Sequence, residues 1–367
     1  MATIAYLLKP RAPLHLGERG IGIEESANLV HSDTLFSALV SAWRALGLGI
    51  EQWIAPPNAL RLTSALPFIE NEKKERVLFF PKPAGLRLNV IERGGAPSGK
   101  AGKKVTLLSR DLFARVIQGE EITLTLPWAR DASAAKAVVA QSAQGGRALM
   151  TWEEYEKIAS VFAQQAEPGA RRLWIGSDEE GGTVPRVTVD RIRSSSNIFF
   201  CGAVRFAPGC GLYFVADCQT DENQQCVEAA LDYLAAEGLG GRRSQGYGQF
   251  EWERLGDWSP PQAARPNAWV TLSLYHPQES ERTIFADART RYDLLQRRGW
   301  IYSPDGSSYR RRRVTMLAEG AVLSSQVVGD IVDVTPIAQV LPHKVYRHGL
   351  AFTLPVALPV PHLEEKP

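Results

Sequence analysis

A glycine-rich stretch is the part of this sequence with the clearest chemistry: residues 238–248 read GLGGRRSQGYG. Glycine has no Cβ atom and adopts backbone conformations that other residues avoid, so a ligand can come close to the main chain. Backbone N–H groups in such a stretch can point at anionic oxygens. Arg242 and Arg243 add two cations, Ser244 a hydroxyl and Tyr247 a ring on which a base can stack. This combination fits a phosphodiester backbone.

The stretch differs from the nucleotide-binding loop that begins many ATPase folds. It lacks the G-K-[ST] ending, and it follows an expected helix where that loop follows a strand. The alternative interpretation is a flexible connection after the helix, but such a connection needs no pair of adjacent arginines. The glycines expected to bring the main chain close to the ligand are Gly240, Gly241, Gly246 and Gly248.

A second candidate lies at the start of an expected helix, where His31, Ser32 and Asp33 follow one another. Helix N-termini favour anions, and His and Ser side chains can contact phosphate or ribose oxygens. Simple capping by Ser32 or Asp33 explains the same residues equally well. The long loop before this helix, residues 10–31, carries Arg19 among several glycines, and long ordered loops are often functional.

Two further stretches combine arginine with polar or aromatic residues. Residues 189–197 hold Arg191, Arg193 and Ser194, which fit either a backbone clamp or a solvated turn. Tyr309 precedes four consecutive arginines, residues 310–313. This run comes before an apolar strand, so it can form a basic rim that faces RNA or an acidic protein surface. Residues expected to extend the rim are Lys344, Tyr346, Arg347 and His348.

Composition and motif searches exclude several classes of protein. Of the 367 residues, 44% are hydrophobic and 22% charged, which excludes wholesale disorder, and a net charge of +2 indicates no partner. The four cysteines form no C-x-x-C pair, so we expect free, buried thiols. No signal peptide or membrane span is visible, which predicts a cytoplasmic protein without membrane contact. We find no catalytic or cofactor motif and expect neither enzymatic activity nor a cofactor or metal.

The elements that must position these residues follow a recognisable order. We expect a strand at 3–9, a helix from Ser32 or Asp33 to Gly47, and a hairpin at 60–69 and 76–80. A strand at 212–216, a helix at 221–237 and a strand at 249–255 complete a βαββαβ order, typical of an α+β, ferredoxin-like (RRM-like) fold. The helices of such a fold cover one face of the sheet, and the open face can receive an extended polymer.

The chain is long enough for two domains. The first is expected to span 1–255, with an insertion at about 84–185 that contains a helix capped by Thr151 and Glu154. A proline-rich linker at 259–261 leads to a second ferredoxin-like domain at 262–367. Its expected elements are strands at 269–275, 312–318, 327–334 and 345–354 and a helical patch near 287–298.

The residues described above resemble those of the RAMP superfamily of CRISPR proteins, whose ferredoxin-like domain carries a glycine-rich loop between its second helix and last strand. Four segments are similar to the fourth Csm subunit of type III-A systems, in the Cas5-like group. These segments are 14–20 (LHLGERG), 31–39 (HSDTLFSAL), 297–301 (RRGWI) and 344–353 (KVYRHGLAFT).

The resemblance implies a non-catalytic subunit of a type III-A effector complex in antiviral defence. Such a subunit grips the 5′ tag of the guide RNA, docks on the large polymerase-like subunit and on the neighbouring backbone RAMP subunit, and lies near the target RNA. It also implies a thumb-like hairpin within 84–185 that reaches the guide–target duplex. The alternative is a guide-RNA-processing endoribonuclease of the same superfamily, for which His31 is the suggestive base and His15 lies on the same loop. A protein-interaction scaffold that touches no RNA is a third possibility.

Overall fold

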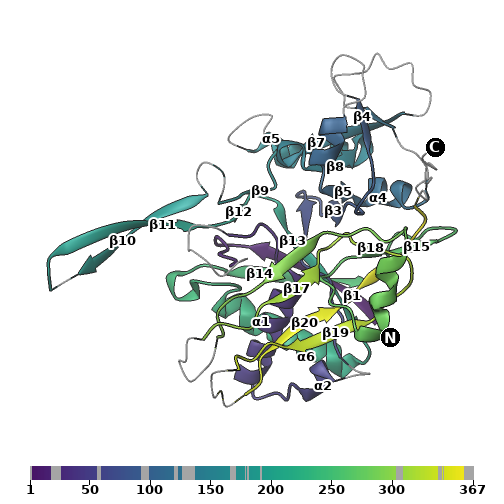
Figure 1. Cartoon of the computed structure of the whole chain (residues 1–367). Helices are drawn as coiled ribbons and strands as arrows, with labels where there is room; N and C mark the ends of the chain where they lie inside the picture. The colour runs from purple at the N-terminus through teal and green to yellow at the C-terminus, as the bar shows by residue number, and fades with distance from the viewer. Residues whose placement is uncertain are drawn as a thin grey trace, which may run out of the picture.

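The computed structural model describes most of the chain. The described residues are 2–17, 26–55, 59–91, 99–119, 123–125, 137–165, 171–177, 179, 182–190, 192–302, 309–337, 341 and 343–358. All statements below concern these residues. They form one large mixed sheet flanked by helices, three small sheets toward the C-terminus and a hairpin that projects from the body (Figure 1).

Four strands and two helices make up the first structural unit. The strands are β1 (Ala2–Pro10), β2 (Leu66–Glu70), β13 (Cys210–Cys218) and β14 (Phe250–Asp257), and the helices are α1 (Ser32–Ala45) and α6 (Asp221–Glu237). The strands lie in the order β14-β1-β13-β2, with each neighbouring pair antiparallel. Strand β13 thus lies between β1 and β2, which is the split βαβ arrangement.

The insertion continues this sheet. Strand β3 (Arg76–Pro81) pairs with β2, and the order then runs through β5, β8, β7, β6 and β4. These strands are β4 (Asn89–Ile91), β5 (Leu107–Ser109), β6 (Thr123–Thr125), β7 (Ala137–Ala143) and β8 (Ala148–Thr151). Its helices are α3 (Gly99–Lys104), α4 (Arg110–Val116) and α5 (Trp152–Ala163), and a 3-10 turn covers Gln144–Gly146. The inserted segment therefore builds onto the first sheet.

Both faces of the central strands are buried, so the prediction of an open sheet face is wrong. Ile4, Tyr6 and Leu8 of β1 pack in the cluster that holds the apolar residues of α1 and α6. Ala5 and Leu7 point to the opposite face, where they are fully buried in a cluster that includes residues of the C-terminal region. No face of these strands is left for a polymer, and a binding surface must be sought elsewhere.

The C-terminal region consists of short antiparallel strands. The three sheets pair β15 (Ala268–Thr271) with β18 (Val322–Leu323) and β21 (Thr353–Val356), β16 (Leu294–Arg297) with β17 (Val314–Leu317), and β19 (Gly329–Asp333) with β20 (Tyr346–Leu350). The only helical segment described in this C-terminal region is a 3-10 helix at Glu279–Ala286. It lies before the expected helical patch, whose residues 294–297 form a strand. A second ferredoxin-like domain is not confirmed.

Helix boundaries agree with the sequence where local capping decides them. Helix α5 begins after Thr151 in the expected capping box with Glu154, and α6 covers the expected 221–237. Helix α1 differs, because its N-cap is His31 and the side chains of Ser32 and Asp33 are buried elsewhere. The short helix α2 (Glu51–Ile54) follows α1. Cys201, Cys210 and Cys218 are buried free thiols as expected, whereas Cys226 is only partly buried.

A two-stranded hairpin stands clear of the body. Strands β10 (Thr183–Asp190) and β11 (Ser195–Gly202) pair with each other and with no other described strand (Figure 1). Next to them, β9 (Trp174–Ile175) pairs with β12 (Arg205–Phe206). The hairpin begins where the expected insertion ends, so it lies C-terminal to the segment in which a thumb-like hairpin was predicted.

No helix in the described residues is long and apolar enough to cross a membrane.

Candidate nucleic-acid interface

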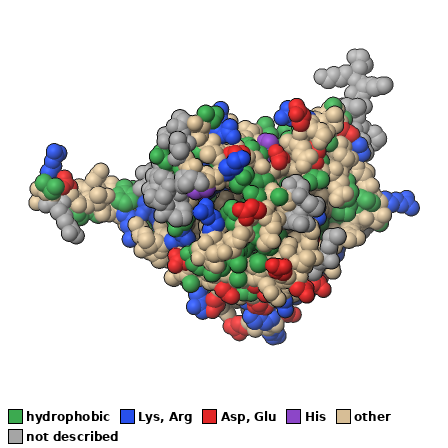
Figure 2. All heavy atoms as spheres, turned by 90° about the horizontal axis from the view of Figure 1, so that it is seen from below, with side chains coloured by type: hydrophobic (Ala, Val, Ile, Leu, Met, Phe, Trp, Pro, Cys, Tyr) green, Lys and Arg blue, Asp and Glu red, His purple; other side chains and the backbone are tan. Residues whose placement is uncertain are grey.

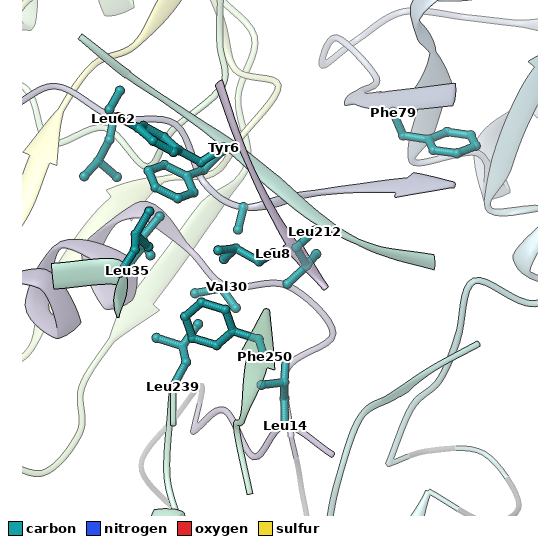
Figure 3. Packing of buried hydrophobic residues seen from close by; sticks show 14 of the residues in the cluster. Tyr6, Leu8, Leu14, Val30, Leu35, Leu62, Phe79, Leu212, Leu239 and Phe250 are labelled. Atoms are coloured by element: carbon teal, nitrogen blue, oxygen red, sulfur yellow. The ribbon is translucent and has the colours of Figure 1, made fainter. Parts of the chain in front are cut away.

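The glycine-rich stretch divides into an anchored part and an exposed turn. Leu239 is buried in the main core, where Leu14 and Phe250 belong to the same cluster and lie close by (Figure 3). Gly238, Tyr247 and Gly248 are also buried, whereas Ser244, Gln245 and Gly246 are exposed. The two ends of the stretch are thus held in the core while its middle reaches solvent.

Most of the glycines serve close packing within the protein. A Cβ atom on Gly248 would lie 2.2 Å from the carbonyl oxygen of Leu239, and one on Gly240 would lie 2.7 Å from that of His15. The N–H groups of Gly241 and Gly248 donate to the carbonyl oxygens of His15 and Pro13. These amides are therefore occupied, which corrects the expectation that Gly240, Gly241 and Gly248 lie open to a ligand. Among the glycines of residues 238–248, only Gly246 has open space where a Cβ would lie.

The exposed turn is defined here as residues 242–246, in which Arg242 and Arg243 are partly buried and the other three residues are exposed, and it keeps the features that suit an anion. Arg242 adopts a left-handed backbone conformation (φ 58°), and Arg243–Gln245 form a single 3-10 turn. Within the described chain, the N–H groups of Arg242, Arg243 and Ser244 meet no backbone or side-chain acceptor. The Arg242 guanidinium lies 5.7 Å from the ring centre of Phe199, and its Nη1 donates to Gln245 Oε1. Main-chain donors and two cations thus meet at one small turn.

Tyr247 does not offer a free ring, contrary to the sequence-based expectation. Its side chain is only 4% exposed, because the residue follows the turn back into the core. The Arg186 guanidinium covers the ring at 5.9 Å from its centre, and Arg186 Nη2 lies 3.4 Å from the Tyr247 hydroxyl. Tyr247 therefore ties the base of the projecting hairpin to the glycine-rich stretch.

The structure separates Arg193 and Ser194 from the exposed turn. Both residues are exposed at the far end of the hairpin, where Asp190 Oδ1 accepts from the backbone N–H groups of Ile192 and Arg193. The four residue steps from Arg186 to Asp190 alone span about 13 Å of strand. Of the two interpretations of this segment, the solvated turn describes its local structure. Arg191 and Arg19 lie outside the described residues.

His31 and Ser32 are buried, which corrects their assignment as RNA-binding residues. His31 Nδ1 lies 2.7 Å from Glu319 Oε1, and the Ser64 hydroxyl also donates to that carboxylate. Ser32 is fully buried, and its Oγ accepts from the Leu274 backbone N–H at 3.0 Å. Because both side chains are occupied by the C-terminal region, His31 has no access to a scissile RNA bond. His15 is likewise engaged, with Nδ1 2.8 Å from the Gly202 carbonyl oxygen.

Asp33 is the centre of a buried ionic junction between α1 and the C-terminal region. Its carboxylate binds Arg297 Nε at 2.9 Å and Arg347 Nη1 at 2.6 Å, and all three side chains are almost fully buried. Burial alone would raise the pKa of Asp33, but the two guanidinium groups hold this pKa well below its ordinary value. Burial, together with the like charges of Arg347 and Arg297, lowers the pKa of Arg311 to about 10.

The expected basic rim is therefore divided. Arg347 and His348 face inward, and burial lowers the pKa of His348 to about 4. Arg310, Arg312 and Arg313 are exposed. The exposed members keep the character expected of a rim, whereas the buried ones hold the two parts of the chain together.

Sequence reasoning missed two exposed aromatic residues beside these arginines. Trp300 is 52% exposed and Tyr302 65% exposed. The Arg310 guanidinium lies 4.8 Å from the ring centre of Trp300, and that of Arg243 lies 4.7 Å from the ring centre of Tyr302. The alternation of Trp300, Ile301 and Tyr302 was the available signal, since it marks an extended segment with one buried and two outward side chains.

Basic side chains lie near the base of the projecting hairpin. Figure 2 shows Lys and Arg side chains on the body near this hairpin, whereas acidic and basic side chains are intermixed along the lower edge of that view. The described residues contain no group of three or more His, Cys, Asp or Glu side chains that could hold a metal ion. The arrangement can therefore bind an anionic polymer through guanidinium groups, free amides and aromatic rings.

Comparison with known proteins places this geometry in a family context. Residues 265–356 match the model of the CRISPR Csm4 C-terminal domain. The chain is 24% identical over 388 aligned residues to the CRISPR system Cms protein Csm4 of Methanocaldococcus jannaschii, covering 95% of this chain and 96% of that protein. It is 27% identical over 176 residues to the Csm4 protein of Thermococcus onnurineus, covering 48% of this chain and 54% of that protein.

Solved structures show the same fold. The chain matches a crystal structure of the Csm3–Csm4 subcomplex of the type III-A CRISPR-Cas interference complex with a TM-score of 0.62 and 19% identity, covering 96% of this chain and 99% of that chain. It also matches a Csm1–Csm4 cassette in complex with pppApA with a TM-score of 0.52 and 18% identity, covering 98% and 99% of the respective chains.

Proposed function

We propose that this chain, which belongs to the Csm4 family of type III CRISPR subunits, is a non-catalytic RNA-binding subunit that holds the 5′ tag of the guide RNA. The observation that carries the proposal is the exposed turn 242–246. It presents two guanidinium groups and main-chain N–H groups without a protein acceptor in the described chain, at the surface of an otherwise packed core. Phosphate oxygens are the natural acceptors for such donors.

The projecting hairpin supports a second part of the proposal. Directly opposed pairs on its two strands, Val187 with Ile198 and Pro185 with Phe200, share one face. Val187, Ile198 and Phe200 are all strongly exposed, as is Ile192 at the tip. Exposed apolar side chains can wedge between stacked base steps of a duplex. We assign this hairpin, residues 183–202, as the thumb-like element that reaches the guide–target duplex, and so place the target RNA nearby.

Protein partners follow from the relatives. Solved Csm4 chains occur in a subcomplex with Csm3 and in a cassette with Csm1. By this analogy, the chain docks on a backbone RAMP subunit and on the large polymerase-like subunit, in a cytoplasmic ribonucleoprotein. No described feature favours the endoribonuclease alternative, because His31 is held in a buried pair with Glu319.

The phosphate contact is tested with the purified full chain and a fluorescent single-stranded RNA carrying a repeat-derived 5′ tag. Arg242→Ala with Arg243→Ala is expected to weaken binding and to lower the slope of log K against log salt by about 1.4, since each phosphate contact on single strands contributes about 0.7. The matched control is Lys73→Ala with Lys74→Ala, which removes two adjacent exposed cations from another turn. A double arginine variant that binds with unchanged affinity and slope would overturn the phosphate-clamp assignment.

A further inference from the structure

Two arginine-covered aromatic rings lie at the boundary between the glycine-rich stretch and the C-terminal region. Trp300 belongs to the short extension that follows β16, and it pairs with Arg310 in an isolated antiparallel bridge. The extension continues through hydrogen bonds from Ile301 N–H to the Tyr309 carbonyl and from Arg311 N–H to the Gly299 carbonyl. Two extended segments therefore hold the aromatic residues in place.

Alternation along this extension decides which side chains face outward. Ile301 is 6% exposed and packs in a small core with Val314 and Met316. Since successive side chains of an extended segment point to opposite faces, Trp300 and Tyr302 point away from that core. Both rings are consequently exposed to solvent on a backbone that the buried Ile301 side chain holds against the small core.

Each ring is covered by a cation. Arg310 lies over Trp300 from the opposing segment, whereas Arg243 reaches Tyr302 from the glycine-rich stretch. Neither arginine forms an ion pair with a carboxylate of the described residues, so both charges remain available. Arg243 thus belongs at once to the exposed turn and to the aromatic pair, which makes the two features one continuous surface.

We propose that Trp300 and Tyr302 are stacking platforms for unpaired bases of a single-stranded RNA whose phosphates lie on the 242–246 turn. Aromatic rings beside guanidinium groups are the side chains on which unstacked bases rest, and the rings accept any base because every base has a flat face. The proposal rests on the proposed RNA-binding function. It adds the residues that hold bases to those that hold phosphates, and it extends the site onto the C-terminal region.

Binding of the full chain to the tag RNA, followed by fluorescence anisotropy at fixed salt, tests this assignment. Trp300→Ala and Tyr302→Ala are each expected to weaken binding roughly five- to a hundredfold, which is the usual range for one stacked base. Trp300→Phe and Tyr302→Phe should keep most of the affinity because they keep a ring. The salt dependence should stay unchanged in all four variants, since stacking releases no counterions.

Leu294→Ala is the matched control. Leu294 is 61% exposed on the neighbouring strand β16 but has no aromatic ring on which a base can stack, so its removal should leave RNA affinity unchanged. The urea unfolding midpoint of every variant should equal that of the parent chain, because the replaced side chains are exposed.

The outcomes separate this inference from the function on which it rests. A parent chain that binds no RNA would overturn both. A parent chain that binds RNA, with alanine variants that bind as tightly, would overturn stacking alone and leave the phosphate site standing. Alanine variants that retain RNA but lose association with a protein subunit would likewise overturn stacking and identify the aromatic surface as a protein contact.

Discussion

Arginine performs opposite tasks in two regions of this molecule. At the buried junction, Arg297 and Arg347 surround Asp33, and each guanidinium is removed from water. At the exposed turn and the adjoining aromatic surface, three arginines lie over aromatic rings and have no carboxylate partner in the described chain. They are Arg242, Arg243 and Arg310. Residue type alone does not distinguish these tasks, whereas burial and the presence of a carboxylate do.

The two regions should also contribute to different properties of the protein, the buried junction to stability and the exposed turn to ligand binding. A buried charge that loses its partner remains unsolvated, so disruption of the junction should act mainly on folding. An arginine that is exposed or only partly buried, as at the turn and the aromatic surface, still contacts water, so its loss should act mainly on a ligand. Variants in the two regions should therefore show separable effects, and the predictions below test that separation.

The largest effect is expected from Asp33→Ala. This change leaves Arg297 and Arg347 buried without a counter-charge, and we expect the free energy of unfolding to fall by about 3–5 kcal/mol. Urea denaturation measures it. The control is Glu251→Ala, which breaks an exposed pair with Arg11 and should cost under about 1 kcal/mol. Equal losses in the two variants would refute the distinction between the two regions.

The second largest effect is expected from acid, which should lower the free energy of unfolding by protonating His348 in the buried region. The folded-state pKa of His348 is about 4, below its ordinary value of 6.5, because burial disfavours the charged ring. The unfolded chain therefore binds more protons between these values, and stability rises with pH. We expect the contribution of His348 to the free energy of unfolding to be fully present above about pH 6.5. This contribution should fall by about 3 kcal/mol as the pH drops to about 4. His348→Gln should flatten this interval, and an unchanged slope in that variant would exclude His348 as the cause.

A smaller effect should distinguish the two parts of the glycine-rich stretch. Gly248 and Gly246 both have positive φ values, 83° and 79°, but only Gly248 would bring a Cβ against backbone atoms. We expect Gly248→Ala to cost at least about 2 kcal/mol of unfolding free energy and Gly246→Ala about 1 kcal/mol. Thermal or urea unfolding of both variants measures the difference, and equal costs would contradict the anchored-and-exposed division.

Local features of the sequence predicted local features of the fold. The Thr151 capping box and the apolar pattern of 221–237 define α5 and α6, because the signals for a helix end lie within a few residues. The strands around 212–216 and 250–255 were equally visible as apolar or alternating runs. The superfamily resemblance likewise used short segments, and the comparisons with known Csm4 proteins support it.

Long-range pairing could not be predicted in the same way. Asp33 meets Arg297 and Arg347, which are 264 and 314 residues farther along the chain, so no local pattern marks these three as partners. His31 and Ser32 looked like ligand-binding residues because a helix N-terminus is usually accessible, and here it is covered. Glycine was similarly ambiguous, since a residue without Cβ serves a packed backbone and an approaching ligand alike.

The junction around Asp33 bears on how the protein is made. During synthesis, helix α1 leaves the ribosome some three hundred residues before Arg347, and strand β1 must wait for β13 and β14. Even after β1 has paired, a nascent chain carries an unneutralised Asp33 until Arg297 and Arg347 emerge, and the apolar face formed by Ala5 and Leu7 stays uncovered until the C-terminal region is made. Such an exposed apolar surface is the condition that invites aggregation and chaperone binding. A shortened chain that ends near residue 255 should consequently remain insoluble when expressed alone.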